Sequence, residues 1–387
     1  MPAVGTEKQK FRNEDLVLTV TEAIDRSKWN ESKYEAFLDE LSGDREYQKE
    51  AIRTALRFLL GGEYKNLRAL ARQNFDENAT LASRYGTVIG FEKHLQLPEK
   101  LAASLDLATG TGKSYVMYGI AAIMLAEGAV DRVLVLCPST TIEFGLLDKF
   151  RDLAGQTDLR DLLPEDSKIT APVIINASES IVASAICVEN YHAILEHVGS
   201  SIRDSLKGKG ERTLVLNDET HHVYESPTQT KKWRQFLADE AFGFKYVIGV
   251  SGTCYIDDEY FSDVIFRYSL REAIEQRYVK KVDYVAEMPK TGDQDEKWQL
   301  IRNHHEENRK KLNKRKLRPL TIIVTPTVNR CIDIGEELKS FLIENAALSH
   351  NEADERVLVI YNGARDVSKL PSVDSSKSKV EWIVSVT

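Results

Sequence analysis

Two short polar stretches contain the residues best suited to chemistry. The first, Gly110-Thr111-Gly112-Lys113-Ser114, lies between two apolar runs. Glycines let backbone N–H groups turn toward phosphate oxygens, and the N-terminus of a following helix adds positive potential. The Lys113 amine can reach the β- and γ-phosphates of a nucleotide, and the Ser114 hydroxyl can bind Mg²⁺. This stretch therefore predicts a phosphate-binding loop between a strand and a helix.

The loop departs from the strict pattern G-x-x-x-x-G-K-[ST], because Leu107 stands where the first glycine belongs. Taken by itself, the stretch could also be a chance glycine-rich turn.

The second stretch is the acidic pair Asp218-Glu219, which follows the apolar run Thr213 to Leu216. Open parallel sheets bind ligands at the carboxyl ends of their strands, so these carboxylates are expected at a ligand-binding edge. Asp218 would hold Mg²⁺ through water, and Glu219 would orient or deprotonate an attacking water. A surface turn is a second interpretation. A metal centre that adds His221 and His222 is a third, although no H-x-x-x-H spacing supports it.

The pattern of apolar and polar residues along the chain predicts the elements that must position these residues. Residues 1–100 are mainly helical and polar, with apolar residues at three- and four-residue spacing. From about Leu101, short β-branched runs alternate with amphipathic stretches, which indicates a parallel sheet covered by helices. We expect a helical N-terminal region over 1–100, an α/β domain over 101–289, a charged helical connector over 290–318 and a second α/β domain over 319–387.

The second α/β domain looks incomplete. It offers about three strands, and the last runs into the final residue, Thr387. A buried parallel strand needs neighbours on both sides. We therefore expect either that the chain is a fragment of a longer protein or that the unit is completed by other means.

Composition excludes several classes of protein. The 387 residues carry a formal net charge of −8, which argues against a uniformly basic nucleic-acid coat but not against a local basic groove. The longest apolar stretch, Ser114 to Ala126, is too short to cross a bilayer, so no membrane association is expected. The four cysteines stand far apart and suggest neither a zinc site nor disulfides, which favours a cytoplasmic location.

A basic run, Arg309 to Arg318, holds seven basic residues. Such runs are most often solvated helix faces. A contact with nucleic-acid phosphates is the sharper alternative.

Together, the motifs resemble those of superfamily 2 helicases and translocases. "ATGTGKS", from Ala108 to Ser114, resembles motif I of that superfamily, in which an Ala-Thr-Gly run replaces the first glycine. "DETH", from Asp218 to His221, resembles a DExH box. "VLVLCPSTTI", "VSGT" and "LTIIVTPT" resemble motifs Ia, III and IV, and "EYQKEAI" resembles the adenine-reading Q motif.

Within the superfamily, the chain is most similar to the restriction subunit of type III restriction–modification enzymes. The likeness rests on "SLREAIEQRYVKKVDYVAE", Ser269 to Glu287, which directly follows the SGT motif, and on the second histidine of "DETHH". Related type I motor subunits share much of this pattern. The resemblance implies an α/β fold of two RecA-like domains, the second incomplete here, with DNA, single- or double-stranded, as substrate. It also implies a methyltransferase, or modification, subunit as partner.

The resemblance also implies roles for individual residues, with ATP and Mg²⁺ as cofactors. Nucleotide binding would involve Gln48 at the adenine and the phosphate-loop residues Thr109, Gly110, Thr111, Gly112, Lys113 and Ser114. Catalysis would use Lys113, Asp218, Glu219 and His221, with Ser114 and Asp218 on the metal. Ser251 and Thr253 would couple nucleotide state to domain movement, and Ser139, Thr140 and Thr327 would contact the nucleic-acid backbone.

Two other functions stay open at this point. One is an RNA helicase, because such motors contact mainly the backbone of either nucleic acid. The other is a nucleotide-dependent binding switch that never translocates. The sequence lacks motif VI and the P-D…(D/E)-x-K nuclease of the type III family, and "DEK" at Asp295 to Lys297 has no strand to support it. A motor limited to these residues is expected to hydrolyse ATP poorly.

Overall fold

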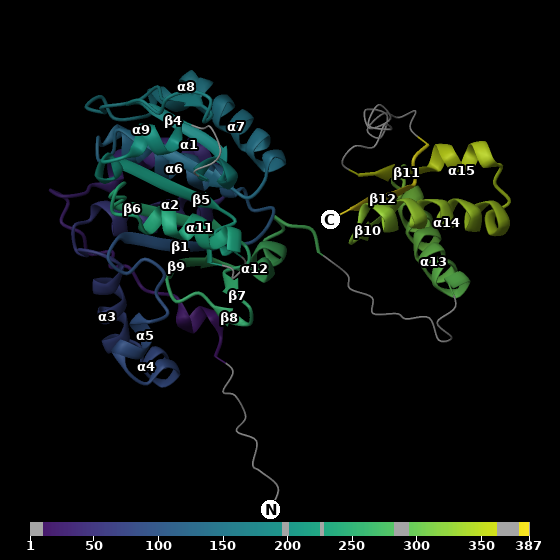
Figure 1. The fold of residues 1–387 in the computed structure, drawn as a ribbon, viewed down its shortest axis with the longest axis horizontal. Helices are drawn as coiled ribbons and strands as arrows, with labels where there is room; N and C mark the ends of the chain where they lie inside the picture. Colours follow the sequence, from purple (N-terminus) through teal and green to yellow (C-terminus); the bar gives the residue numbers. More distant parts are fainter. Residues whose placement is uncertain (1–10, 196–200, 225–227, 282–293, 362–378, 387) are drawn as a thin grey trace, which may run out of the picture. The chain divides into compact units, whose positions relative to one another are not determined.

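The computed structural model describes residues 11–195, 201–224, 228–281, 294–361 and 379–386. It divides into two compact units, residues 1–281 and 282–387, and each is described by itself (Figure 1). Within the described residues, no helix is long and apolar enough to cross a membrane.

The first unit contains a seven-stranded sheet with strand order β3-β4-β2-β5-β6-β1-β9, and all of its strand pairs are parallel. The strands are β1 Leu101–Leu107, β2 Arg132–Cys137, β3 Val173–Ile175, β4 Ala185–Asn190, β5 Thr213–Asp218, β6 Tyr246–Ser251 and β9 Val264–Tyr268. A separate hairpin joins β7 Tyr255–Ile256 to β8 Glu259–Tyr260.

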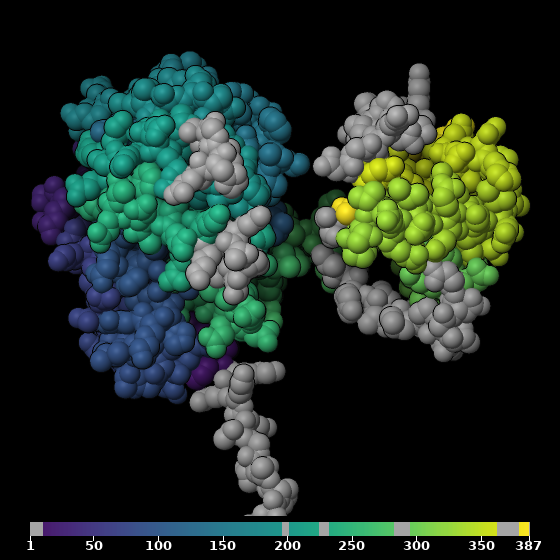
Figure 2. Space-filling view, in the orientation of Figure 1, coloured from purple at the N-terminus to yellow at the C-terminus, as the bar shows by residue number. Residues whose placement is uncertain are grey.

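Helices cover both faces of this sheet, because its strands are apolar on both sides. In β2, Val133 and Val135 face one core and Leu134 and Leu136 face the other, and all four are fully buried. The first core is formed with α1 Glu35–Ser42, α2 Glu46–Leu60, α3 Leu67–Glu77, α4 Ala79–Tyr85, α5 Val88–Glu92, α6 Lys113–Ala126, α7 Thr140–Gly155, α8 Thr157–Asp161 and α12 Leu270–Glu275. The second is formed with α9 Ile202–Leu206, α10 His221–Tyr224 and α11 Thr228–Ala238. Helices α3 to α5 form the blue part of the surface of this unit in Figure 2.

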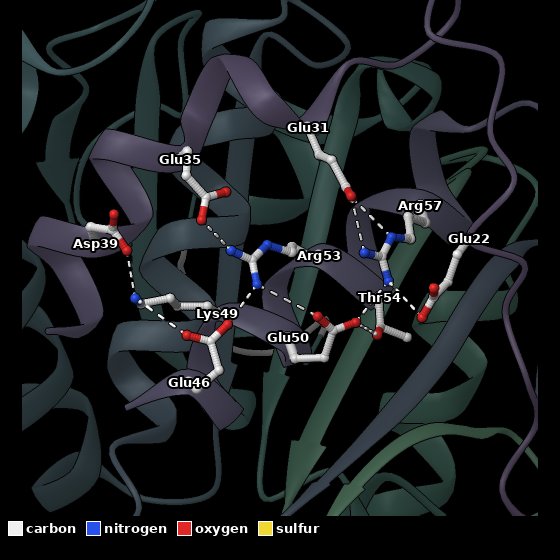
Figure 3. Close-up of polar contacts among 10 residues, drawn as sticks. All are labelled: Glu22, Glu31, Glu35, Asp39, Glu46, Lys49, Glu50, Arg53, Thr54 and Arg57. Atoms are coloured by element: carbon white, nitrogen blue, oxygen red, sulfur yellow. Dashed lines mark hydrogen bonds and ion pairs between the residues drawn. The ribbon is translucent and has the colours of Figure 1, made fainter. Parts of the chain in front are cut away.

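Short 3-10 helices complete the first unit at η1 Asn13–Leu16, η2 Glu31–Tyr34, η3 Tyr191–Ile194 and η4 Gly210–Arg212. The segment before α2 is held by an ion-pair ladder on that helix (Figure 3). Lys49, Arg53 and Arg57, spaced four residues apart, pair with Asp39, Glu35 and Glu31 respectively. Because spacing of four places side chains on one helix face, the ladder fixes that face of α2 against the N-terminal segment.

The second unit is a three-stranded parallel sheet of order β10-β12-β11, with β10 Thr321–Thr325, β11 Val357–Ile360 and β12 Trp382–Val386. Its helices are α13 Gln294–Asn313, α14 Val328–Ala346 and α15 His350–Arg356. The charged stretch predicted as a connector forms α13, and Trp298 and His305 on it are each only 2% exposed. The helix therefore packs as part of this unit. The two parallel sheets confirm the predicted α/β, RecA-like fold class.

Candidate nucleotide-binding and catalytic site

The predicted phosphate loop lies between β1 and α6. Gly110 and Gly112 have φ angles of +84° and +80°, which favour glycine because other residues are strained there. The Thr111 side chain turns inward and donates from Oγ1 to the carbonyl of Ala108 at 2.6 Å. Thr109 is exposed, and Ser114 is half-buried in the first turn of α6. The loop thus has the conformation that a phosphate-binding turn requires.

Gln48 and its neighbour Tyr47, in the first turn of α2, form hydrogen bonds to this loop. Gln48 Nε2 and Tyr47 Oη both donate to the carbonyl oxygen of Thr111, at 2.7 and 2.8 Å. A Cβ atom on Gly112 would stand only 2.6 Å from Gln48 Nε2. Gln48 is 2% exposed, so its amide supports the loop in this structure, and its predicted contact with adenine stays a prediction.

The structure brings Lys113 and the acidic pair together. Strands β1 and β5 both flank β6 and end at the same edge of the sheet, so the loop after β1 faces the residues after β5. There, Lys113 Nζ forms an ion pair with Glu219 Oε1. Glu219 itself has a φ of +50°, an unusual backbone conformation for a side-chain-bearing residue. Such strain is common at functional sites.

Asp218 lies beside this ion pair at the buried end of β5. Its Oδ1 has no hydrogen-bond partner among the residues that the structure describes. Burial raises the pKa of Asp218 to about 6; the charge of Lys113 opposes this rise and that of Glu219 adds to it. A buried carboxylate oxygen without a described partner, at the sheet edge that also carries the phosphate loop, fits a hydrated Mg²⁺, because Mg²⁺ prefers oxygen ligands.

His221 connects the acidic pair to the Ser-Gly-Thr motif. Its Nδ1 lies 2.8 Å from Ser251 Oγ and 3.1 Å from Thr253 Oγ1. Ser251 Oγ also donates to Glu219 Oε2 at 3.1 Å. Three predicted residues from two motifs, 30 positions apart, therefore share one hydrogen-bond network with Glu219.

Gly252, between those two hydroxyl residues, touches the beginning of the phosphate loop. A Cβ atom at this position would lie 3.0 Å from both the carbonyl oxygen of Leu107 and the amide nitrogen of Thr109. Glycine allows this close approach of two backbones. A movement of the phosphate loop would therefore displace the Ser-Gly-Thr motif directly.

The residues predicted to contact nucleic acid lie at the N-terminal ends of two helices, one in each unit. Ser139 caps α7 by accepting a hydrogen bond from the Ile142 amide, and Thr140 is exposed in the first turn of that helix. Thr327 caps α14 in the same way, but it belongs to the second unit. All three roles stay predictions. In the basic run Arg309 to Arg318, every residue but Leu312 is exposed, as a solvated helix face and the turn after it would be.

The alternative metal centre has no support in the described part of the chain, where no group of three or more His, Cys, Asp and Glu side chains is placed to hold a metal ion. The four cysteines are buried and free. Tyr47 was not predicted, although its place beside Gln48 was a signal. Tyr268 and Tyr278, which pack around it, were not predicted either.

A family model described as "Type III restriction enzyme, res subunit" matches residues 42–256, more than half of the chain. The match includes the phosphate loop, the acidic pair and the Ser-Gly-Thr motif. No curated protein is similar enough in sequence to match.

Several solved structures have a partly similar backbone. Dbp5 of S. cerevisiae, bound to RNA and ADP BeF3, is 12% identical with a TM-score of 0.37 over 81% of this chain and 75% of that chain. A nuclease-deletion mutant of the Type ISP restriction-modification enzyme LlaGI, in complex with a DNA substrate mimic, is 14% identical with a TM-score of 0.36. That similarity covers 69% of this chain, which spans only 23% of the LlaGI chain. UvsW of bacteriophage T4 is 13% identical with a TM-score of 0.27, over 81% of this chain and 61% of that one.

Proposed function

Because this chain belongs to the family of the res subunit of type III restriction enzymes, we propose that it is a DNA-dependent ATPase motor of a restriction-type system. Family membership supports a nucleic-acid helicase or ATPase in general. DNA as the substrate, Mg²⁺ as the cofactor and a modification subunit as partner are the finer parts of the proposal.

One observation carries the proposal, namely that Lys113 and Glu219 meet in a direct ion pair at the carboxyl edge of the sheet. Two motifs predicted separately to bind phosphate and to activate water thus converge on one place. In this conformation Lys113 neutralises Glu219. A nucleotide phosphate would compete for the Lys113 amine and leave Glu219 to accept a proton from water.

The remaining residues have complementary roles in this proposal. Asp218 and Ser114 would hold Mg²⁺, which supplies charge neutralisation of the phosphates when bound. The His221–Ser251–Thr253 network would sense whether Glu219 is paired with Lys113 or released. Ser139 and Thr140, on the first unit, and Thr327, on the second, would contact nucleic-acid phosphates without reading sequence.

The test is ATP hydrolysis by the full chain with Mg²⁺, measured alone and with single-stranded DNA, duplex DNA or RNA. Lys113→Ala and Glu219→Gln should each lower the rate by at least about 10²-fold, because both remove a group at the reacting phosphate. Lys93→Ala, at an exposed lysine away from the loop, is the matched control.

The stimulating polymer separates the alternatives. Stimulation by DNA supports the proposal, whereas stimulation by RNA alone favours the RNA helicase. Nucleotide-dependent DNA binding without hydrolysis favours the binding switch. If Lys113→Ala and Lys93→Ala leave the same rate as the unchanged protein, the site assignment is wrong.

A further inference from the structure

The basic run Arg309 to Arg318, at the end of α13, has no role in the proposed hydrolysis. All seven of its basic side chains are exposed, although the whole chain carries a formal net charge of −8. Between Glu307 and Asp333 the sequence contains no acidic residue. The run is therefore a local concentration of positive charge on an acidic protein.

Most of these charges take no part in an ion pair among the residues that the structure describes. Arg309 is the exception, because it pairs with Glu306 at 3.2 Å and with Glu381 at 4.0 Å. The other six form what we call the basic patch, namely Lys310, Lys311, Lys314, Arg315, Lys316 and Arg318. The cations of the ladder on α2, by contrast, are all paired with carboxylates. The basic patch thus carries charge that the described fold does not neutralise.

The turn after α13 gathers these charges into one place. The amide of Lys316 donates to the carbonyl of Asn313 at 3.0 Å, and the amide of Leu317 donates to the carbonyl of Leu312 at 3.2 Å. These two bonds form the helix-capping motif in which a residue of positive φ, usually glycine, reverses the chain. Here that residue is Lys316, with a φ of +57°. The lysine adds a cation at a position where glycine would fit the backbone better.

The basic patch lies at the amino edge of the sheet of the second unit. His305, one turn before Arg309, has its Nδ1 2.8 Å from Thr321 Oγ1 at the start of β10. Glu381, which pairs with Arg309, directly precedes β12. Thr327, the predicted nucleic-acid contact of this unit, follows the other end of β10, and the five residues of that strand separate the two ends by roughly 16 Å. The patch is therefore a surface separate from the one predicted around Thr327.

The patch has the composition of a surface that binds phosphates. Exposed lysine and arginine side chains bind nucleic-acid phosphates without reading the sequence. Ten residues at the helical rise span about 15 Å, over which a DNA duplex presents about nine phosphate charges and a single strand about four. No aromatic residue lies between Arg309 and Pro326 to stack on the bases of a single strand. Six clustered cations therefore match the backbone of a duplex best.

We infer that the basic patch binds the phosphate backbone of duplex DNA, as a second nucleic-acid surface apart from the residues of the motor. The inference rests on the proposed function for DNA as the polymer, and it adds a surface that holds this polymer. Binding at the patch raises the affinity of the chain for DNA and takes no part in hydrolysis. It needs neither nucleotide nor a particular base sequence, and it weakens steeply with salt.

The experiment measures binding of a short fluorescent DNA duplex of mixed sequence to the full chain, without nucleotide, over a series of salt concentrations. The quadruple variant Lys310→Gln, Lys311→Gln, Lys314→Gln and Arg315→Gln should reduce the slope of log affinity against log salt by about three to four units, since each cation releases about one counterion. The matched control removes four exposed lysines of the first unit, Lys65→Gln, Lys93→Gln, Lys207→Gln and Lys209→Gln. It changes the net charge equally and should reduce the slope by less than about one unit.

Lys316→Gly separates binding from folding. Glycine fits the positive φ at this position, so the variant should raise the unfolding temperature of the second unit. It should nevertheless bind the duplex more weakly, with a slope reduced by about one unit. The charge-preserving variant Lys310→Arg, Lys311→Arg and Lys314→Arg should keep both the affinity and the slope of the unchanged protein.

A salt slope in the quadruple variant equal to that of the control would overturn the inference and favour an acidic protein as the partner of the patch. An unchanged protein that does not bind the duplex would overturn it as well. ATP hydrolysis tests the proposed function separately. The quadruple variant should need at least about tenfold more DNA for half-maximal stimulation and reach the same maximal rate. If DNA does not stimulate the unchanged protein while the slope still falls in the quadruple variant, the proposed function fails and the DNA-binding surface is supported.

Discussion

At the scale of single residues, Asp218 shows a conflict between stability and function. Its carboxyl is buried with one unpartnered oxygen, and its pKa is raised to about 6. An unfolded Asp titrates near pH 4, so the folded state binds this proton more tightly than the unfolded state does. The stabilising contribution of the protonated carboxyl is therefore complete below about pH 4 and is lost as the pH rises through 6.

Asp218→Asn should consequently abolish ATP hydrolysis while stabilising the protein free of nucleotide and metal. The gain in free energy of unfolding is expected to approach about 3 kcal/mol above pH 7 and to vanish near pH 4. Urea unfolding of both proteins at pH 4.5 and 7.5 measures it. A variant that is less stable than the unchanged protein at pH 7.5 would contradict the assigned cost of burial.

Gly112 is constrained both by its positive φ angle and by the close approach of the Gln48 side chain. Gly112→Ala adds a Cβ atom where φ is +80° and where Gln48 Nε2 would stand 2.6 Å away. We expect at least about tenfold weaker nucleotide binding and a cost of roughly 1–2 kcal/mol, because both the turn and the Gln48 bond to Thr111 must distort. Gly145→Ala is the control, since nothing lies near that helical site and alanine favours helix there by about 1 kcal/mol. Equal nucleotide affinities of Gly112→Ala and Gly145→Ala would contradict the positive φ angle and the close Gln48 contact assigned to Gly112.

At the scale of elements, the ladder on α2 sets the position of Gln48. Arg57 is the most enclosed of its cations, with a side chain 9% exposed that contacts Glu31 through Nε at 2.8 Å and Glu50 through Nη1 at 2.7 Å. Arg57→Gln removes the cation that pairs with Glu31 and leaves Glu50 with Arg53 alone, at 3.6 Å. We expect a loss of about 2 kcal/mol in unfolding free energy, between the values for exposed and buried pairs.

Arg12→Gln provides the comparison for that variant. Arg12 pairs with Asp15 in the same chemical manner, but its side chain is 78% exposed. Its loss should leave the free energy of unfolding almost unchanged, because solvent screens an exposed ion pair. If chemical denaturation gives the two variants similar stabilities, burial does not strengthen the ladder and α2 is held by its apolar face alone.

The elements also show how far the sequence could predict the site. The phosphate loop and the strand before Asp218 were predictable because glycine, lysine and carboxylate spacing act locally. Strand β9 and the hairpin before it were not expected, because Val264–Tyr268 mixes apolar and charged residues and adopts its conformation by pairing with β1. The contact of His221 with Ser251 depends on the adjacent placement of β5 and β6, which no local pattern encodes. The burial of Gln48 likewise depends on packing between helix and loop.

At the scale of the whole molecule, the two units have separate cores. Trp298, 2% exposed, packs with residues of the second unit, and Trp233, fully buried, packs with residues of the first. Trp233 also donates from Nε1 to Asn217 Oδ1 at 3.0 Å, next to Asp218. We therefore expect two calorimetric unfolding transitions, each sensitive to only one of these tryptophans.

Trp298→Ala should lower the transition of the second unit by roughly 15 °C or more, because loss of a buried tryptophan costs about 3–5 kcal/mol in a unit of about a hundred residues. Trp233→Ala should lower the other transition by a smaller number of degrees, because the first unit is larger and unfolds with more entropy. Only Trp233→Ala should also impair tripolyphosphate binding, since it removes the hydrogen-bond donor to Asn217, the residue next to Asp218. A single transition that shifts in both variants would mean that the two units unfold together. It would also mean that a substitution in the core of either unit affects the phosphate loop.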